Sequence, residues 1–170
     1  MIPNTIFRNP FLSWILTSAL IYSGLFWAYY VGLISHIYHN DFTHIAAGLL
    51  AVFVYVNLSL GVMAHKLQTF INNDEKQIYE TSIFYTNFDV IGYFALTAPS
   101  LGFLGTVIGL TELMRDAATV DINTIAGLIG NGTGAALYPT GVGLVMFLVI
   151  SFQKFLQTHA FRIYGFAREL

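Results

Sequence analysis

Two stretches of this chain decide its fold: Ala98-Pro99-Ser100-Leu101-Gly102-Phe103-Leu104-Gly105-Thr106-Val107-Ile108-Gly109-Leu110 and Ala135-Ala136-Leu137-Tyr138-Pro139-Thr140-Gly141-Val142-Gly143-Leu144. Each stretch lies in a long apolar run and places one threonine among small residues. Small residues about one helical turn apart let membrane helices pack backbone to backbone. A hydroxyl held there is idle, bonded to its own backbone, or part of a polar path. The pairing of two such stretches favours the path.

The composition indicates a membrane protein. Of the 170 residues, 56% are hydrophobic and 9% are charged, and the mean hydropathy is +0.66. Soluble domains carry about 25% charged residues, so these charges are too few to solvate a globule of this size. Four segments without charge are each near or above the roughly 20 residues that cross a bilayer. The sequence therefore predicts an all-α integral membrane protein with four transmembrane helices, at approximately 11–34, 45–64, 89–114 and 124–153.

Lysine and arginine positions predict the orientation, because cytoplasmic segments of membrane proteins are enriched in them. Only Arg115 lies on one side of the predicted membrane; the other side carries Arg8, Lys66, Lys76, Lys154, Arg162 and Arg168. Both termini are therefore expected in the cytoplasm, with 65–88 as a short cytoplasmic loop that holds one amphipathic helix. Residues 154–170 are expected to form a cytoplasmic helical extension, and 1–170 a single transmembrane domain.

The two threonines are expected to reach similar depth in the membrane. Thr106 lies 17 residues after Asp89, and Thr140 lies 14 residues before Lys154. At 1.5 Å per residue these separations are roughly 25 and 21 Å in antiparallel helices. We predict an ion path along Thr106, Tyr138, Pro139 and Thr140. The alternative is that each hydroxyl bonds its own helix.

Further residues have expected roles around this path. Prolines 99 and 139 are expected to interrupt helices three and four, which are otherwise extended and line the pore. The outer mouth is expected at Glu112 and Arg115, for which a solvated helix end with an i,i+3 pair is the alternative. Asp89 is expected at the inner end, either on the exit path or as a helix cap. Helix packing is expected at Gly102, Gly105, Gly109, Gly134, Gly141 and Gly143.

Several chemistries are excluded or disfavoured by the residues present. The absence of cysteine excludes disulfides and thiol catalysis. The net charge of −2 comes without a basic patch, so no nucleic-acid partner is expected. Zinc could be held by residues of the outer loop, because imidazole and carboxylate are its ligands, but we favour no metal, no cofactor and no enzyme activity. The residues of that alternative are His36, His39, Asp41 and His44.

Both glycine-rich stretches resemble the MotA/TolQ/ExbB proton-channel family, the larger subunits of ion-driven motors. Residues 98–109 are similar to the ExbB and TolQ pattern A-P-x-x-G-L-x-G-T-V-x-G, and 136–144 are similar to A-L-x-A-T-A-x-G-L. Four spans with both termini inside look like MotA, whereas ExbB and TolQ have three. The chain departs from the pattern at Ala135, where ExbB and TolQ carry glutamate, and at Pro139, which replaces a small residue. The large cytoplasmic domain of MotA and ExbB has no counterpart here.

The resemblance implies a function and partners. A homopentamer would surround the helices of two single-span MotB-, ExbD- or TolR-like subunits, in contact with lipids of a bacterial inner membrane. The partner would supply the aspartate that binds the ion, H⁺ or Na⁺, and ion flow would drive rotation or other mechanical work. Flagellar rotation, uptake, envelope maintenance, gliding and phage defence all remain open. The alternative function is a structural or scaffold membrane protein whose glycines only pack helices.

Chemical labelling of single cysteines tests the predicted topology. Cysteines introduced at Asn40 and Ala118 should react with a membrane-impermeant thiol reagent in intact cells, because both positions are expected outside. A cysteine at Asn73 should react only after the cells are opened. The opposite labelling pattern would overturn the orientation.

Overall fold

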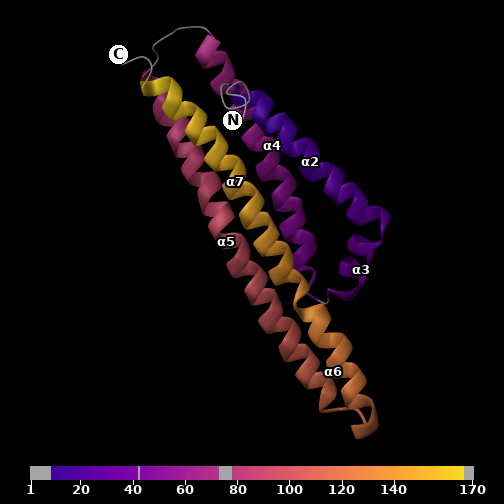
Figure 1. Ribbon diagram of the computed structural model, residues 1–170. Coiled ribbons are helices and arrows are strands. Elements are labelled where there is room, and N and C mark those ends of the chain that lie inside the picture. The colour runs from indigo at the N-terminus through magenta and orange to yellow at the C-terminus, as the bar shows by residue number, and fades with distance from the viewer. Residues whose placement is uncertain (1–8, 42, 73–77, 167–170) are drawn as a thin grey trace. The chain divides into compact units, whose positions relative to one another are not determined.

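The computed structural model describes residues 9–41, 43–72 and 78–166, and this part of the chain is helical without any strand (Figure 1). The helices are α2 (Pro10–Tyr30), α3 (Leu33–Asn40), α4 (Ile45–Asn72), α5 (Ile78–Ala117), α6 (Ile122–Ala136) and α7 (Tyr138–Phe166). Four segments are long and apolar enough to cross a membrane: Pro10–Tyr30, Ile45–Thr69, Phe88–Ala117 and Thr124–Ala160. The chain is therefore a multi-pass membrane protein, as its composition predicted.

The segment between spans two and three differs from the expected single amphipathic helix. Helix α4 continues to Asn72 and α5 begins at Ile78, so the described part of this segment consists of two helix ends; residues 73–77 lie outside the described residues. The α5 start also corrects one interpretation of Asp89, which lies well inside the helix and is exposed, so it is not a cap. Helical hydrogen bonding continues past the apolar span because the polar residues there, such as Lys66 and Gln68, are good helix formers.

The two prolines behave differently. The predicted interruption at Pro139 is present, since α6 ends at Ala136 and α7 begins at Tyr138. Proline is favoured in the first turn of a helix, where its missing N–H needs no partner. The predicted interruption at Pro99 is wrong, because α5 runs through this residue without a break.

The segment between spans one and two is also more helical than expected. Helix α2 ends at Tyr30, and Gly32 takes a left-handed conformation with φ of 81° before α3 begins. Glycine adopts this conformation without steric cost, so it allows the chain to turn. The expected loop at 35–44 is therefore largely the helix α3.

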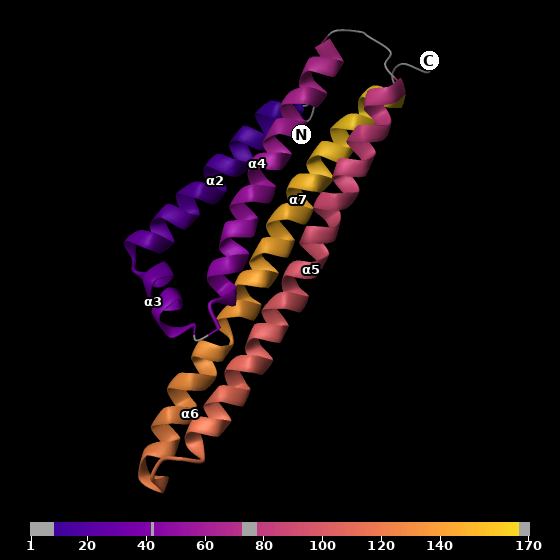
Figure 2. The ribbon, with the colours of Figure 1, turned by 180° about the vertical axis from the view of Figure 1, so that it is seen from behind.

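The chain forms two compact units, each built from several helices. Unit 1 comprises Met1–Leu25, Val54–Phe94 and Val149–Leu170, and unit 2 comprises Phe26–Phe53 and Ala95–Leu148. In unit 2, α5 and the α6–α7 pair lie side by side and run in opposite directions (Figures 1 and 2). Unit 1 packs α2 and α4 with α7.

A buried polar cluster holds unit 1 together. Asn57, which is fully buried in α4, donates through Nδ2 to Gln153 Oε1 of α7 at 2.9 Å. Ser18 and Tyr22 of α2 donate to Asn57 Oδ1 at 3.3 and 3.2 Å. Trp14 Nε1 donates to the Asn57 carbonyl at 3.1 Å. Polar groups inside a membrane need such partners, so these bonds link three helices.

Span two, which is rich in Val, Leu and Phe, is partly buried against other helices. Its apolar window is 39% buried, compared with 11% for the window of α2. The indole of Trp14 lies on Gly61 so closely that a Cβ there would collide with the ring. One face of α4 is thus a packing surface for α2 and α7.

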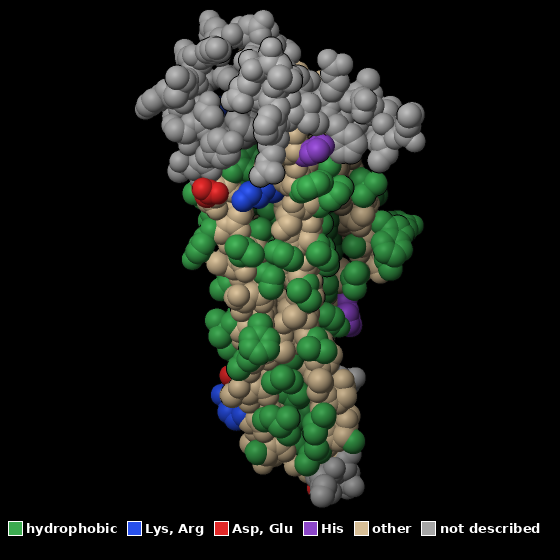
Figure 3. Space-filling model, turned by 60° about the vertical axis from the view of Figure 1, so that its left-hand side comes forward, with side chains coloured by type: hydrophobic (Ala, Val, Ile, Leu, Met, Phe, Trp, Pro, Cys, Tyr) green, Lys and Arg blue, Asp and Glu red, His purple; other side chains and the backbone are tan. Residues whose placement is uncertain are grey.

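Much of the exposed surface of the described residues is apolar. Hydrophobic side chains cover much of the described face in Figure 3, with few charged groups among them. Phe103 is 63% exposed, Leu148 is 63% exposed and Trp27 is 64% exposed. Large apolar patches of this kind require lipid or another protein chain as their surroundings.

Replacing Asn57 by leucine should destabilise unit 1. The change leaves the Gln153 and Ser18 side chains without their Asn57 partner in an apolar environment, which costs about 1–3 kcal/mol. Ser59→Ala is the matched control, because the Ser59 hydroxyl donates to the Tyr55 carbonyl of its own helix at 2.9 Å. Unfolding of the purified protein in detergent measures both. Equal stability of the two variants would contradict a structural role for the cluster.

Candidate functional site

The contact between α5 and the start of α7 in unit 2 depends on glycine. A Cβ added to Gly102 would lie 2.5 Å from the Pro139 carbonyl oxygen, and one added to Gly105 would lie 2.7 Å from Pro139 Cβ. A Cβ on Gly143, on the opposite helix, would lie 2.5 Å from the Ala98 carbonyl oxygen. Real side chains do not tolerate these distances, so the two backbones approach this closely only because both sides lack a Cβ.

The six glycines expected to pack fall into two groups. Gly102, Gly105, Gly109 and Gly143 lie at this contact; a Cβ on Gly109 would be 3.1 Å from Ala136 Cβ. A Cβ on Gly134 or Gly141 would meet nothing within 4 Å, and both residues are exposed in the single chain. These two glycines therefore face away from the α5 contact.

The close approach brings the two threonine hydroxyls together. Thr106 Oγ1 and Thr140 Oγ1 lie 2.6 Å apart, and either can be the donor. Thr106 is 7% exposed, and Thr140 is half-buried. Their predicted arrival at the same depth is therefore present in the structure.

Other threonines form a hydrogen bond to their own helix, which was the alternative predicted for Thr106 and Thr140. Thr111 Oγ1 donates to the Val107 carbonyl of its own helix at 2.8 Å, and Thr69 Oγ1 donates to the His65 carbonyl at 3.1 Å. The hydrogen bond described for Thr106 and Thr140 runs between helices instead. A pair of hydroxyls has one hydrogen not used in the mutual bond and several free acceptor positions. It can therefore offer a donor and acceptors to a passing water or ion.

Tyr138 and Pro139 directly precede Thr140, just after the break between α6 and α7. Pro139 is almost fully buried against Gly102 and Gly105, so its side chain packs the two helices together. Tyr138 is half-buried and makes an edge-to-face contact with His36 of α3, with ring centroids 5.8 Å apart. His36 was expected only as a member of an outer-loop cluster.

The structure does not assemble that cluster as a zinc site. In the described ranges, no group of three or more His, Cys, Asp or Glu side chains is placed to hold a metal ion. The carboxylate of Asp41 instead caps the start of α4. It accepts hydrogen bonds from Thr43 N at 3.1 Å, from Thr43 Oγ1 at 2.6 Å and from Ala46 N at 2.8 Å.

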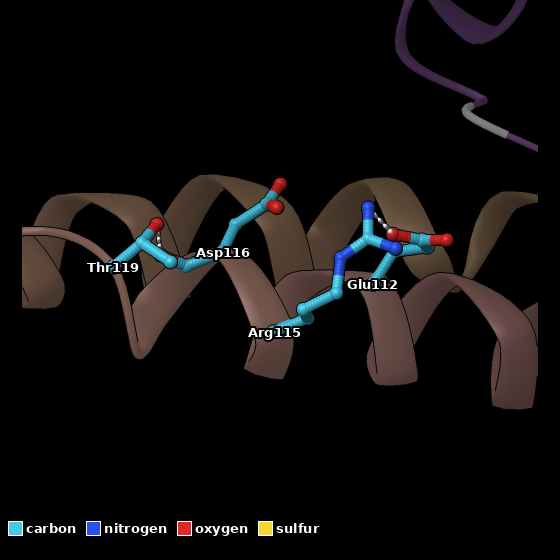
Figure 4. A network of polar contacts seen from close by, with 4 residues as sticks. All are labelled: Glu112, Arg115, Asp116 and Thr119. Carbon is cyan, nitrogen blue, oxygen red and sulfur yellow. Dashed lines mark hydrogen bonds and ion pairs between the residues drawn. The ribbon is translucent and has the colours of Figure 1, made fainter.

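At the end of α5, charged side chains gather beyond the uncharged span (Figure 4). Arg115 forms an ion pair with Glu112, and their side chains are 72% and 43% exposed. Thr119 Oγ1 donates to the Asp116 carbonyl oxygen at 2.8 Å. The solvated i,i+3 pair that was the alternative for Glu112 and Arg115 is thus present, and an outer-mouth role stays a prediction.

Sequence reasoning missed the amides of unit 1. Asn57 is the one amide in the apolar stretch 45–64, and Gln153 was taken only as the end of span four. An amide without hydrogen-bond partners inside an apolar span is energetically costly. The presence of Asn57 in such a span could therefore have indicated a polar partner on another helix. Its partner, however, is 96 residues away in the sequence.

These features define a class: a multi-pass helical membrane protein whose close-packed, glycine-rich helices hold a partly buried pair of hydroxyls. Residues 56–164, more than half of the chain, match the model of the MotA/TolQ/ExbB proton channel family. The chain belongs to this family. The matched region contains both glycine-rich stretches.

One curated relative is the biopolymer transport protein exbB1 of Vibrio cholerae serotype O1. It is 24% identical over 96 residues, which cover 55% of this chain and 42% of the relative. The chain therefore matches less than half the length of that relative. No solved structure matches the chain.

Proposed function

We propose that this protein is the channel-forming subunit of a proton- or sodium-driven motor complex. The observation that carries the proposal is the hydrogen bond of 2.6 Å between Thr106 and Thr140. It joins the two family-like stretches, and both threonines lie within the region that matches a proton channel family. Ion flow past this pair would be coupled to mechanical work.

The chain offers hydroxyls but no titratable carboxylate at this depth. The stretches 90–111 and 124–153 contain no Asp, Glu, Lys, Arg or His. Proton relays in membranes generally use carboxylates or imidazoles. A single-span partner subunit carrying an aspartate would complete the site, with the threonines as the polar wall opposite its carboxylate.

The proposed assembly is a homopentamer around two partner helices in a bacterial inner membrane, with both termini in the cytoplasm. Its support is the family relationship together with the faces that the single chain leaves open. Gly134 and Gly141 have room for another backbone beside them, and such small-residue faces are where membrane helices associate. The apolar faces of α5 and α7 would contact lipid or neighbouring copies.

Substitutions at Thr140 test the ion path. Thr140→Val keeps the side-chain shape but removes the hydroxyl, and about a tenfold or larger loss of ion flux is expected, which corresponds to about 1.4 kcal/mol on the barrier. Thr140→Ser keeps the hydroxyl and should retain much of the flux. The measurement is ion-gradient-driven uptake in proteoliposomes that contain this protein and its partner.

The same pair of changes at Thr106 is the internal comparison, and Thr111→Val is the matched control. Thr111 lies on the same helix, but its hydroxyl is bonded to its own backbone. Wild-type flux in both Thr106→Val and Thr140→Val would remove the threonines from the mechanism and leave these helices a packing role.

Substitution of an open glycine tests the assembly. Gly141→Leu should preserve the fold of the chain, since its Cβ position is free and leucine is the better helix former. It should nevertheless shift native mass spectra from the oligomer toward the monomer. Gly48→Leu is the control, because Gly48 is equally open but lies on α4, outside the glycine-rich stretches. A wild-type protein that is a stable monomer would refute the assembly.

A further inference from the structure

Unit 2 contains a half-open pocket of about 890 Å³, and its lining includes neither Thr106 nor Thr140. It is lined by the end of α5, by the helix α6, by Asn40 at the end of α3 and by Thr43. The charge-free part of α5 ends at Thr111, immediately before the pocket's charged residues. A transition from apolar to charged residues marks the membrane–water interface, so the pocket opens at this level.

The lining of the pocket is amphipathic. Its apolar part consists of Ile108, Leu113, Val120, Leu128 and Ala135, and Gly127 of α6 leaves room beside them. The polar side carries Glu112, Arg115 and Asp116 of α5. Water is disfavoured over the apolar part, and a bare hydrocarbon chain would leave the charges unsolvated. The lining thus fits an amphiphile that has both an apolar and a charged portion.

The charges specify the head group. In Figure 4 the guanidinium of Arg115 and the carboxylate of Asp116 project from the same side of α5. Arg115 is paired with Glu112, but a guanidinium has five N–H donors, so it retains donors for a phosphate. The two carboxylates exceed the single guanidinium by one negative charge. This balance suits a ligand with a phosphate and an ammonium group, and it disfavours a purely anionic lipid.

We propose that this pocket binds a phospholipid whose head group carries a phosphate and a primary ammonium. The phosphate accepts hydrogen bonds from Arg115, and the ammonium donates to Asp116 and Glu112. The upper part of an acyl chain lies over Gly127 and Leu128. The bound lipid fills the space between the α5–α6 hairpin and the residues Asn40 and Thr43.

Native mass spectrometry of the delipidated full-length protein tests the proposal with two probes, dioleoyl-phosphatidylethanolamine and dioleoyl-phosphatidylglycerol. We expect one phosphatidylethanolamine per chain, bound about tenfold more tightly than phosphatidylglycerol. Asp116→Asn should remove most of this preference. Asp121→Asn is its control, since it removes the same charge from the connection that follows α5, outside the pocket lining.

A steric pair of variants makes the test independent of charge. Gly127→Leu should fill the pocket and abolish the tightly bound lipid, whereas Gly130→Leu should not, because Gly130 is equally open on α6 but does not line the pocket. Equal binding of the two lipids, unchanged by Gly127→Leu, would overturn the proposal.

Photo-crosslinking identifies the occupant in native membranes. Benzoylphenylalanine in place of Leu128, which lines the pocket and is already a large side chain, should yield an adduct whose added mass is that of phosphatidylethanolamine. An adduct with a second copy of the chain or with another polypeptide, in place of lipid, would overturn the proposal and make the pocket a protein interface.

Discussion

The close approach of α5 to the start of α7 is the constraint on which unit 2 depends. Lipid tails are as apolar as the helix surfaces, so the hydrophobic effect does not drive these helices together. Association depends on van der Waals contact and on polar bonds, and both need short distances. Gly102, Gly105 and Gly143 provide them by omitting the Cβ atoms that would meet the opposite helix. The hydroxyl pair of Thr106 and Thr140 can form only at this separation.

The break between α6 and α7 adds a second constraint at the same place. A helix interruption leaves backbone groups without their usual partners, and a membrane tolerates this only beside protein or water. Two bonds bridge the break: Leu137 N donates to the Gly134 carbonyl, and Gly141 N donates to the Leu137 carbonyl. Because Pro139 lies in the first turn of α7 and packs on the α5 glycines, the irregular backbone is held against protein. The threonine pair therefore lies beside polar backbone, which an uninterrupted helix would not provide.

The two units use different polar chemistry. Unit 1 is held by amides and hydroxyls of three helices around Asn57, and its central bonds fix α2 and α4 on α7. In unit 2, the hydrogen bond described at the contact between α5 and α7 joins two threonine hydroxyls. The amide of Asn57 donates to one side chain and accepts from two others, all within the packed helices, which suits a structural role. The threonine pair keeps unused hydrogen-bonding capacity, which suits contact with an ion or water.

The sequence by itself determined the four membrane segments, because composition and charge-free length are properties of one chain segment and its solvent. It also determined that Thr106 and Thr140 reach one depth, since helical rise is fixed and the helices are antiparallel. Only the tertiary structure decided that these hydroxyls bond to each other and that Asn57 pairs with Gln153. It also decided that α5 continues through Pro99, whereas the helix is interrupted just before Pro139. These outcomes depend on which helix faces meet, and therefore on the rotation of each helix about its own axis. The helical rise along each segment does not specify this rotation.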